Sequence, residues 1–159
     1  MPGPVLASDR LRERLDLLQG EGRSVVLTNG VFDLLHVGHL RYLRAARAQG
    51  GALVVGVNSD ASVRGLKPGR PLVGEAERAE LVAALEPVDA VVIFDSPTAD
   101  DLIREVRPSV YVKGGDYTEA SLPEAATARE VGARIAFIPL IPGRSTSALL
   151  AELRRHQLD

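Results

Sequence analysis

The sequence predicts an α/β protein in which helices cover both faces of a doubly wound, Rossmann-like parallel sheet of about five strands. Short β-branched apolar runs alternate with longer segments of helical periodicity. The runs are apolar along nearly their whole length, as expected for strands that are covered on both faces. A repeated strand–helix–strand order implies parallel strands joined by right-handed crossovers. The expected strands span residues 24–28, 52–57, 90–94, 109–112 and 134–138.

Helical segments lie between and outside these strands. The first crossover helix carries Leu40, Leu43 and Ala46 on one face, and Gly50 and Gly51 supply its stop. Later helices end before a proline or at a glycine, which are the usual signals of a helix end. The remaining helices are expected at residues 8–19, 79–85, 101–106, 123–131 and 147–157.

Length and composition limit the class of protein. The 159 residues fit a single domain (residues 1–159), with a core from about 24 to 153. There is no cysteine, no signal-peptide pattern and no apolar run near the roughly 18 residues that a membrane span needs. We therefore expect a soluble, cytoplasmic protein. A net charge of −2 gives no reason to expect nucleic acid or a membrane as a partner.

The segment after the first strand, Thr28–His39, is the first candidate site. In a parallel sheet, ligands bind beyond the carboxyl ends of the strands. Gly30 permits a sharp turn, Gly38 permits close approach of a ligand, and His36 and His39 fall where a helix start favours an anion such as phosphate. The alternative is that both histidines only cap and pack the turn. No third ligand is evident nearby, so we expect no metal site.

Two further candidate segments follow later strands. Residues 58–71 interleave glycine and proline with Arg64, Lys67 and Arg70, which suggests a surface loop able to fold over a polyphosphate. The alternative is an ordinary solvated loop. Asp60 is as suited to capping a short helix as to touching a substrate. Lys113, followed by Gly114, Gly115 and Asp116, places an ammonium at a strand end. Lys67 and Lys113 are the only lysines in the chain.

The last candidate segment, Gly143–Ser147, opens the final helix. Ser145 and Thr146 are typical N-cap residues, and with Arg144 they also suit a terminal phosphate of a nucleoside triphosphate. No serine lies in a G-x-S-x-G turn, which disfavours a serine hydrolase.

Together these segments resemble the cytidylyltransferase-like nucleotidyltransferase superfamily, with its H-x-G-H turn and late S-T segment. Here these are His36-Val37-Gly38-His39 and Ser145-Thr146-Ser147. Within it, the chain is most similar to the heptose 1-phosphate adenylyltransferase domains of ADP-heptose synthesis for lipopolysaccharide. The matching segments are Thr28–His39, Val57–Val63, Leu66–Pro71 and Val112–Tyr117.

The resemblance implies that a sugar 1-phosphate oxygen attacks the α-phosphorus of ATP and that pyrophosphate leaves. It implies Mg²⁺ carried on the triphosphate and no organic cofactor. It makes His36, His39 and Lys67 catalytic. It assigns nucleotide and phosphate binding to Thr28, Asn29, Gly30, Phe32, Asp33, Gly38, Arg144, Ser145 and Thr146. It assigns the acceptor or nucleoside side to Asn58, Asp60, Arg70, Lys113, Gly114, Gly115 and Asp116.

Departures from the pattern and rival functions stay open at this point. Pro68 replaces the usual glycine and the stretch from Lys67 to Arg70 is one residue short, which bears on the acceptor. The rivals are a cytidylyltransferase using CTP and glycerol 3-phosphate or a related polyol phosphate, and a non-catalytic nucleotide-binding domain. Homodimers are a family precedent only. These residues contain no sugar kinase, so we expect any heptose kinase to be a separate protein.

Overall fold

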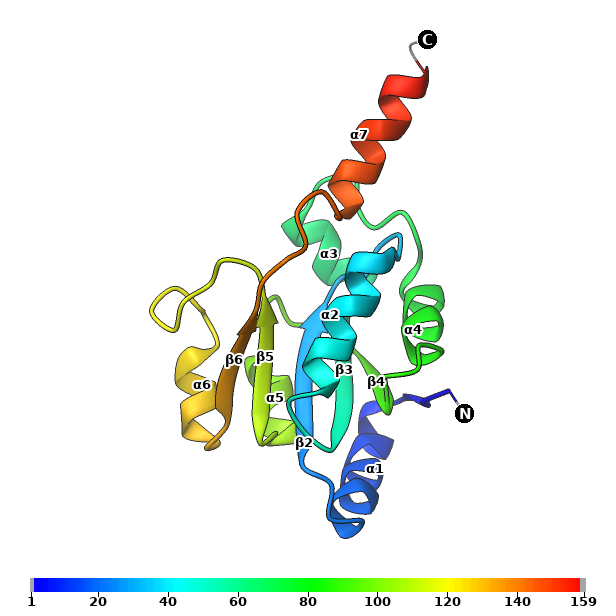
Figure 1. The fold of residues 1–159 in the computed structure, drawn as a ribbon. Coiled ribbons are helices and arrows are strands. Elements are labelled where there is room, and N and C mark those ends of the chain that lie inside the picture. Colours follow the sequence, from blue (N-terminus) through cyan, green and yellow to red (C-terminus); the bar gives the residue numbers. More distant parts are fainter. Residues whose placement is uncertain (1, 158–159) are drawn as a thin grey trace.

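Six parallel strands form one sheet in the computed structural model, which describes residues 2–157 (Figure 1). The strand order is β1-β4-β3-β2-β5-β6, and every neighbouring pair is parallel. This confirms the predicted parallel α/β fold. The strands are β1 (Val5–Leu6), β2 (Val25–Gly30), β3 (Ala52–Asn58), β4 (Ala90–Phe94), β5 (Val110–Gly114) and β6 (Arg134–Ile138).

Helices cover both faces of this sheet. One buried apolar cluster joins α1, α5 and α6 to alternate strand residues such as Val25 and Leu27, and a second joins α2 and α4 to Val26. This alternation follows from the twofold period of side chains along a strand. The helices are α1 (Ser8–Gly20), α2 (Val37–Arg47), α3 (Asp60–Leu66), α4 (Glu75–Ala83), α5 (Asp100–Val106), α6 (Ala125–Glu130) and α7 (Thr146–Gln157).

Two elements were missed by the sequence analysis. The two-residue strand β1 pairs with Val91 and Val92 of β4, and so short a segment carries no periodic signal of its own. Helix α3 lies in the stretch predicted to be loop. The hydroxyl of Ser59 caps this helix by accepting from the Ser62 N–H at 3.2 Å, and Asp60 is its first residue.

The strand order reverses at β2, which pairs with β3 on one side and β5 on the other. Six residue pairs join β2 to β3, whereas only three join β2 to β5, the last being Thr28 with Val112. The two strands therefore part before either ends, which opens space between their carboxyl ends. This is where ligands bind in open α/β sheets.

The last helix, α7, extends beyond this edge of the sheet and away from the body of the molecule (Figure 1). None of its described residues is buried. No helix within residues 2–157 is long and apolar enough to cross a bilayer.

We expect Gly56→Ala to destabilise the fold by about 1–3 kcal/mol, because overpacking a filled core costs that much. A Cβ atom at Gly56, in the buried strand β3, would lie 2.5 Å from Leu102 Cδ2 and 3.1 Å from Phe94 Cε1. Urea denaturation measures the change. Gly65→Ala on α3 is the matched control, because nothing lies within 4 Å of the added atom. Equal stabilities of the two variants would contradict the packing argument.

Candidate active site

The two histidines after β2 cap the N-terminus of α2 reciprocally. His36 is the N-cap residue, and its Nδ1 accepts a hydrogen bond from the Gly38 N–H at 3.0 Å. In return, Nδ1 of His39 accepts from the His36 N–H at 3.2 Å. A neutral imidazole that accepts at Nδ1 carries its proton on Nε2. Capping of the helix therefore uses only Nδ1 of each ring and leaves Nε2 free for another partner.

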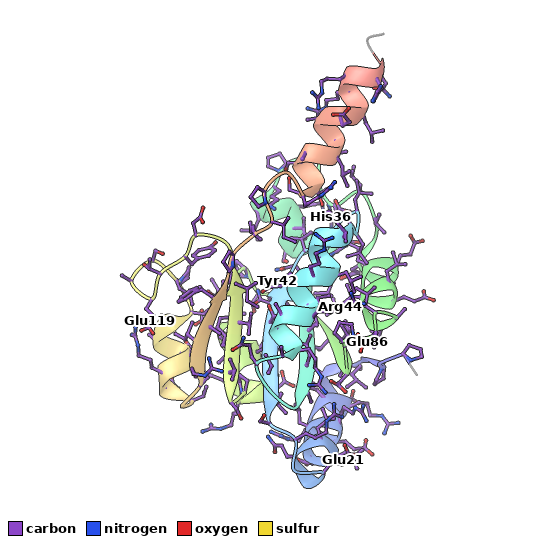
Figure 2. All side chains as sticks on the ribbon, in the orientation of Figure 1. Glu21, His36, Tyr42, Arg44, Glu86 and Glu119 are labelled. Atoms are coloured by element: carbon purple, nitrogen blue, oxygen red, sulfur yellow. The ribbon has the colours of Figure 1, made fainter. Side chains whose placement is uncertain are left out.

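Both imidazoles stay neutral near pH 7 and keep an Nε2–H donor. Burial, followed by the neighbouring His36, lowers the pKa of His39 to about 4. Burial and then the charge of Arg144 lower the pKa of His36. The ring centroids lie 4.0 Å apart, and neither Nε2 has a hydrogen-bond partner among residues 2–157. Figure 2 shows His36 at the start of α2, close to the start of α7.

Gly38 has no room for a side chain. A Cβ atom there would lie 2.6 Å from His36 Cε1 and 3.1 Å from the Arg144 carbonyl oxygen. The preceding loop is also constrained, since Phe32 and Leu34 adopt φ values of 54° and 49°, which non-glycine residues rarely take. The Phe32 ring lies beside His39, with centroids 5.7 Å apart. The turn is thus shaped closely around the histidine pair.

A cavity of about 730 Å³ lies at this edge of the sheet. Segments that follow β2, β3, β4, β5 and β6 all contribute to its wall, as expected for the point where the strand order reverses. The predicted site residues that line it are Asn29, Gly30, Phe32, Asp33, His36, Gly38, His39, Asn58, Lys67, Arg70, Lys113, Gly114, Arg144, Ser145 and Thr146. Four predicted residues do not line it: Thr28, Asp60, Gly115 and Asp116.

Thr28 lies beneath the cavity and joins β2 to β5 and α2. It is fully buried, its Oγ1 donates to the Val112 carbonyl at 2.9 Å, and the same oxygen lies 2.5 Å from the Tyr42 hydroxyl. Burial raises the pKa of Tyr42 to about 12, so this phenol stays protonated. Thr28 therefore shapes the floor of the site and does not itself line the cavity.

The Asp33 carboxylate, predicted to help bind phosphate, is engaged by the protein itself. Its oxygens accept from the Leu72 N–H at 2.8 Å and the Val73 N–H at 3.0 Å, and Arg70 Nη1 lies 3.5 Å away. Its backbone carbonyl also accepts from Thr146 Oγ1 at 2.6 Å. Although Asp33 lines the cavity, it fixes the α3–α4 loop (residues 67–74) and the start of α7.

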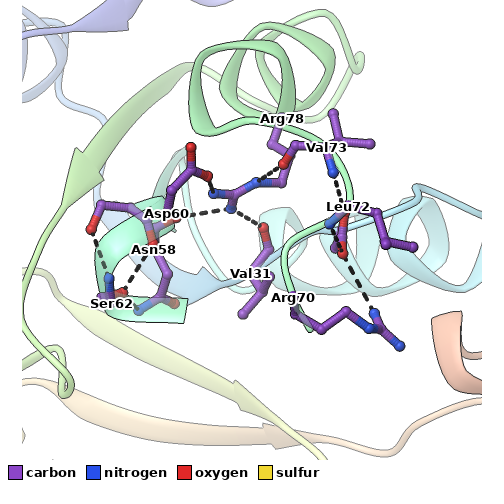
Figure 3. A network of polar contacts seen from close by, with 10 residues as sticks. Val31, Asn58, Asp60, Ser62, Arg70, Leu72, Val73 and Arg78 are labelled. Atoms are coloured by element: carbon purple, nitrogen blue, oxygen red, sulfur yellow. Dashed lines mark hydrogen bonds and ion pairs between the residues drawn. The ribbon is translucent and has the colours of Figure 1, made fainter. Parts of the chain in front are cut away.

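Arg78, which the sequence analysis missed, organises the other side of the site (Figure 3). Its fully buried guanidinium donates to the carbonyls of Val31 at 2.6 Å, Asn58 at 2.8 Å and Val73 at 2.8 Å. It also pairs with the Asp60 carboxylate at 2.8 Å. Asp60 therefore serves this network and not the cavity wall. The available signal was the helical spacing that puts Arg78 on the same face as Val82.

Among the described residues that line the cavity, basic side chains outnumber acidic ones. Arg41, Lys67, Arg70, Lys113 and Arg144 contribute to the wall, and Lys113 Nζ lies 5.5 Å from the centre of the Tyr117 ring. Together with the N–H groups of the α2 start, these charges suit a polyphosphate. Within residues 2–157 no group of three or more His, Asp or Glu side chains could hold a metal ion on its own.

A second cavity, of about 590 Å³, lies between α7 and the Phe32 loop. Its wall is largely apolar and includes Leu81, Leu149 and Leu153. Its wall contains neither histidine of the capping pair, so the groups suited to binding phosphate belong to the first cavity.

The fold and the first cavity define a parallel α/β protein with a neutral histidine pair, of a chemistry suited to an anion, at the point where the strand order reverses. Comparison with known proteins agrees. The profile of the cytidylyltransferase-like family matches residues 27–148. The chain therefore belongs to the cytidylyltransferase-like family, within the nucleotidyltransferase class that its motifs resemble.

The chain is also similar to particular relatives and to a solved structure. It is 48% identical over 146 residues to bifunctional protein HldE of Methylobacillus flagellatus and 50% identical over 135 residues to that of Streptomyces coelicolor. These matches cover 91% and 84% of this chain but only 30% and 29% of the relatives. A lipopolysaccharide core biosynthesis protein from Thermoplasma volcanium superposes with a TM-score of 0.63 at 28% identity, over 76% of this chain and 98% of that one.

We expect Arg78→Met to lower the free energy of unfolding by at least about 3 kcal/mol, because each buried acceptor left without a donor costs about 1–3 kcal/mol. Three carbonyl groups would lose their partner. Chemical denaturation measures this loss. Arg129→Met is the control, since that side chain is 58% exposed and its ion pair with Glu119 contributes little. An Arg78→Met variant as stable as the control would contradict the role given to Arg78.

We expect the free energy of unfolding to fall as the pH is lowered from about 6.5 to about 4. Over this interval the unfolded chain protonates His39 while the folded chain does not, so the unfolded state binds more protons. His39→Gln should lose less stability over the same interval, because glutamine at this position can still accept the His36 N–H but does not titrate. Denaturation curves at pH 7 and 4.5 compare the two, and equal losses would contradict the assignment.

Proposed function

We propose that this chain transfers AMP from ATP to a sugar 1-phosphate, with D-glycero-D-manno-heptose 1-phosphate as the acceptor. The neutral His36–His39 pair carries this proposal, because its two Nε2–H groups point to an anion as their ligand. The similarity to the bifunctional HldE proteins favours adenylyl over cytidylyl transfer and a heptose over a polyol as the acceptor.

In the proposed reaction, an acceptor phosphate oxygen attacks the α-phosphorus of ATP. The bond from that phosphorus to the bridging oxygen of the β-phosphate breaks, and pyrophosphate leaves with the bond's electron pair. Negative charge builds on the non-bridging α-phosphate oxygens. The His36 and His39 Nε2–H groups would donate to these oxygens, and neutral donors fixed by capping need no reorganisation during the reaction.

The other cavity residues would hold the two phosphorylated substrates. Arg144 and Ser145, beside the start of α7, would bind the β- and γ-phosphates of ATP, which arrives as its Mg²⁺ complex. Lys67 and Arg70, in the α3–α4 loop, would bring the acceptor phosphate to the α-phosphorus. Lys113 supplies a further charge at the end of β5. Catalysis would then rest on positioning and charge stabilisation, without a covalent enzyme intermediate.

Pyrophosphate release measured with ATP or CTP, Mg²⁺ and a panel of sugar 1-phosphates and glycerol 3-phosphate tests the proposal. We expect turnover with ATP and the heptose 1-phosphate. His39→Ala removes the Nε2–H donor together with the cap, so kcat should fall by about 10²–10³-fold, as for loss of one oxyanion donor.

Silence of the wild-type protein across the panel would overturn the enzymatic proposal, and turnover only with CTP would overturn the choice of nucleotide. Near-normal kcat of His39→Ala would contradict the catalytic role proposed for that histidine.

A further inference from the structure

Glu124, immediately before α6, presents a buried carboxylate at the cavity wall. The residue is only 4% exposed and contributes to the lining of the 730 Å³ cavity. Its Oε1 accepts from the Ala99 N–H at 3.2 Å. Its Oε2 is buried and has no hydrogen-bond partner among residues 2–157. A buried polar atom without a partner is rare in native proteins and asks for an explanation.

Two hydroxyl groups that lie close along the chain to Glu124 or to Ala99 already donate to another residue. Thr98 precedes the residue that Glu124 holds, and Thr127 lies three residues along α6. Both hydroxyls donate to Asp100, at 2.6 Å from Thr98 and 2.5 Å from Thr127. Neither is therefore turned toward the free oxygen of Glu124.

Tyr111 is a third neighbour, and it is also engaged. Its hydroxyl donates to Asn29 Oδ1 at 2.6 Å. Burial and then the negative charge of Glu124 raise the pKa of Tyr111, so the phenol stays protonated. Its hydroxyl hydrogen goes to Asn29 and does not reach Glu124. Among the described residues, no lysine, arginine or histidine forms an ion pair with Glu124. A buried, uncompensated carboxylate is costly unless something supplies a donor.

A ligand in the cavity can supply that donor, and its chemistry is restricted. A carboxylate oxygen accepts hydrogen bonds and repels phosphate, so Oε2 suits either a hydroxyl group or an amino group. A nucleobase would need apolar walls, and apolar residues line the cavity from α2, from the end of β6 and from the segment after it. The wall residues there are Tyr42, Ala45, Ile138, Leu140 and Ile141.

Glu124 belongs to the other face of the sheet. Helix α6 packs in the cluster with α1 and α5, whereas α2 packs in the opposite one. Three other wall residues lie close along the chain to Glu124 or to its hydrogen-bond partner Ala99. They are Pro97, Thr98 and Pro123. A base held between those apolar residues would therefore lie at a different end of the cavity from the Glu124 carboxylate.

We propose that Glu124 Oε2 accepts a hydrogen bond from a hydroxyl group of the acceptor sugar and so determines specificity for a polyhydroxylated acceptor. The inference rests on the proposed function, in which the acceptor is a sugar 1-phosphate. It adds a residue that selects the sugar part of the acceptor, whereas the cations select its phosphate. Glu124 does not take part in the bond-making step.

The test compares Glu124→Gln with Glu130→Gln, a matched carboxylate-to-amide change at the exposed end of α6. Glutamine at 124 can still accept from the Ala99 N–H but places an NH₂ donor where Oε2 was. We expect kcat/KM for the sugar 1-phosphate to fall roughly 10- to 100-fold, as for loss of a hydrogen bond to a charged group. The Kd for ATP, measured by titration calorimetry, should stay unchanged. Glu130→Gln should match the wild type in both.

A second measurement uses the wild-type protein, so it does not depend on the folding of a variant. Sugar 1-phosphates that each lack one hydroxyl are compared with the parent compound. One deoxy compound should lose a similar factor with the wild type, and Glu124→Gln should show little further discrimination against that same compound. This non-additivity is the signature of a direct contact.

The outcomes separate this inference from the proposed function. With an active wild type, unchanged acceptor kinetics in Glu124→Gln, or weakened ATP binding alone, would overturn the inference and leave the function standing. If the wild type is inactive, the function fails. Calorimetry with sugar 1-phosphate and a non-hydrolysable ATP analogue then decides the inference: binding weakened by Glu124→Gln supports it, and unchanged or absent binding overturns it.

Discussion

Arg78 donates hydrogen bonds to carbonyl groups from three separate segments, and this buried contact sets the geometry of the site. The loop after β2, the end of β3 and the α3–α4 loop all meet its guanidinium (Figure 3). Asp33 ties the same α3–α4 loop back to the β2 loop from the other side. The turn that presents the histidines and the loop that carries Lys67 are thus fixed to one another by groups that need not touch a substrate.

In the proposed function, the histidine pair combines two roles that the sequence analysis treated as alternatives. The H-x-G-H spacing lets each Nδ1 serve the backbone at the start of α2, which orients the rings and fixes the proton on Nε2. Burial keeps the rings neutral. This arrangement of the rings also depends on Gly38, because only a residue without Cβ leaves room for the His36 ring. Capping uses Nδ1 of each ring, and the proposed reaction would use Nε2 of the same ring.

The sequence allowed prediction of the five longer strands and of half of the residues that line the cavity, because both follow from local patterns. Apolar runs mark buried strands, and polar clusters directly after them must gather at one edge of a parallel sheet. The rest depends on contacts between distant segments. Asp33 meets the chain 39 and 40 residues later, Arg78 meets Val31 47 residues earlier, and Glu124 meets Ala99 25 residues earlier. No window of the sequence carries these pairings, so the sequence analysis did not foresee the contacts of Asp33 and Asp60.

The early parting of β2 from β5 means that the cavity is opened by the direction of the backbone and not by small side chains. Pairing stops at Thr28 and Val112, while each strand continues for two more residues. A substitution in the wall can change which molecule fits, yet it cannot rejoin the strands. The residues that choose the substrate are thus distinct from the strand pairing that opens the cavity. Substitutions in the wall can therefore change the substrate while the sheet, and with it the fold, is kept.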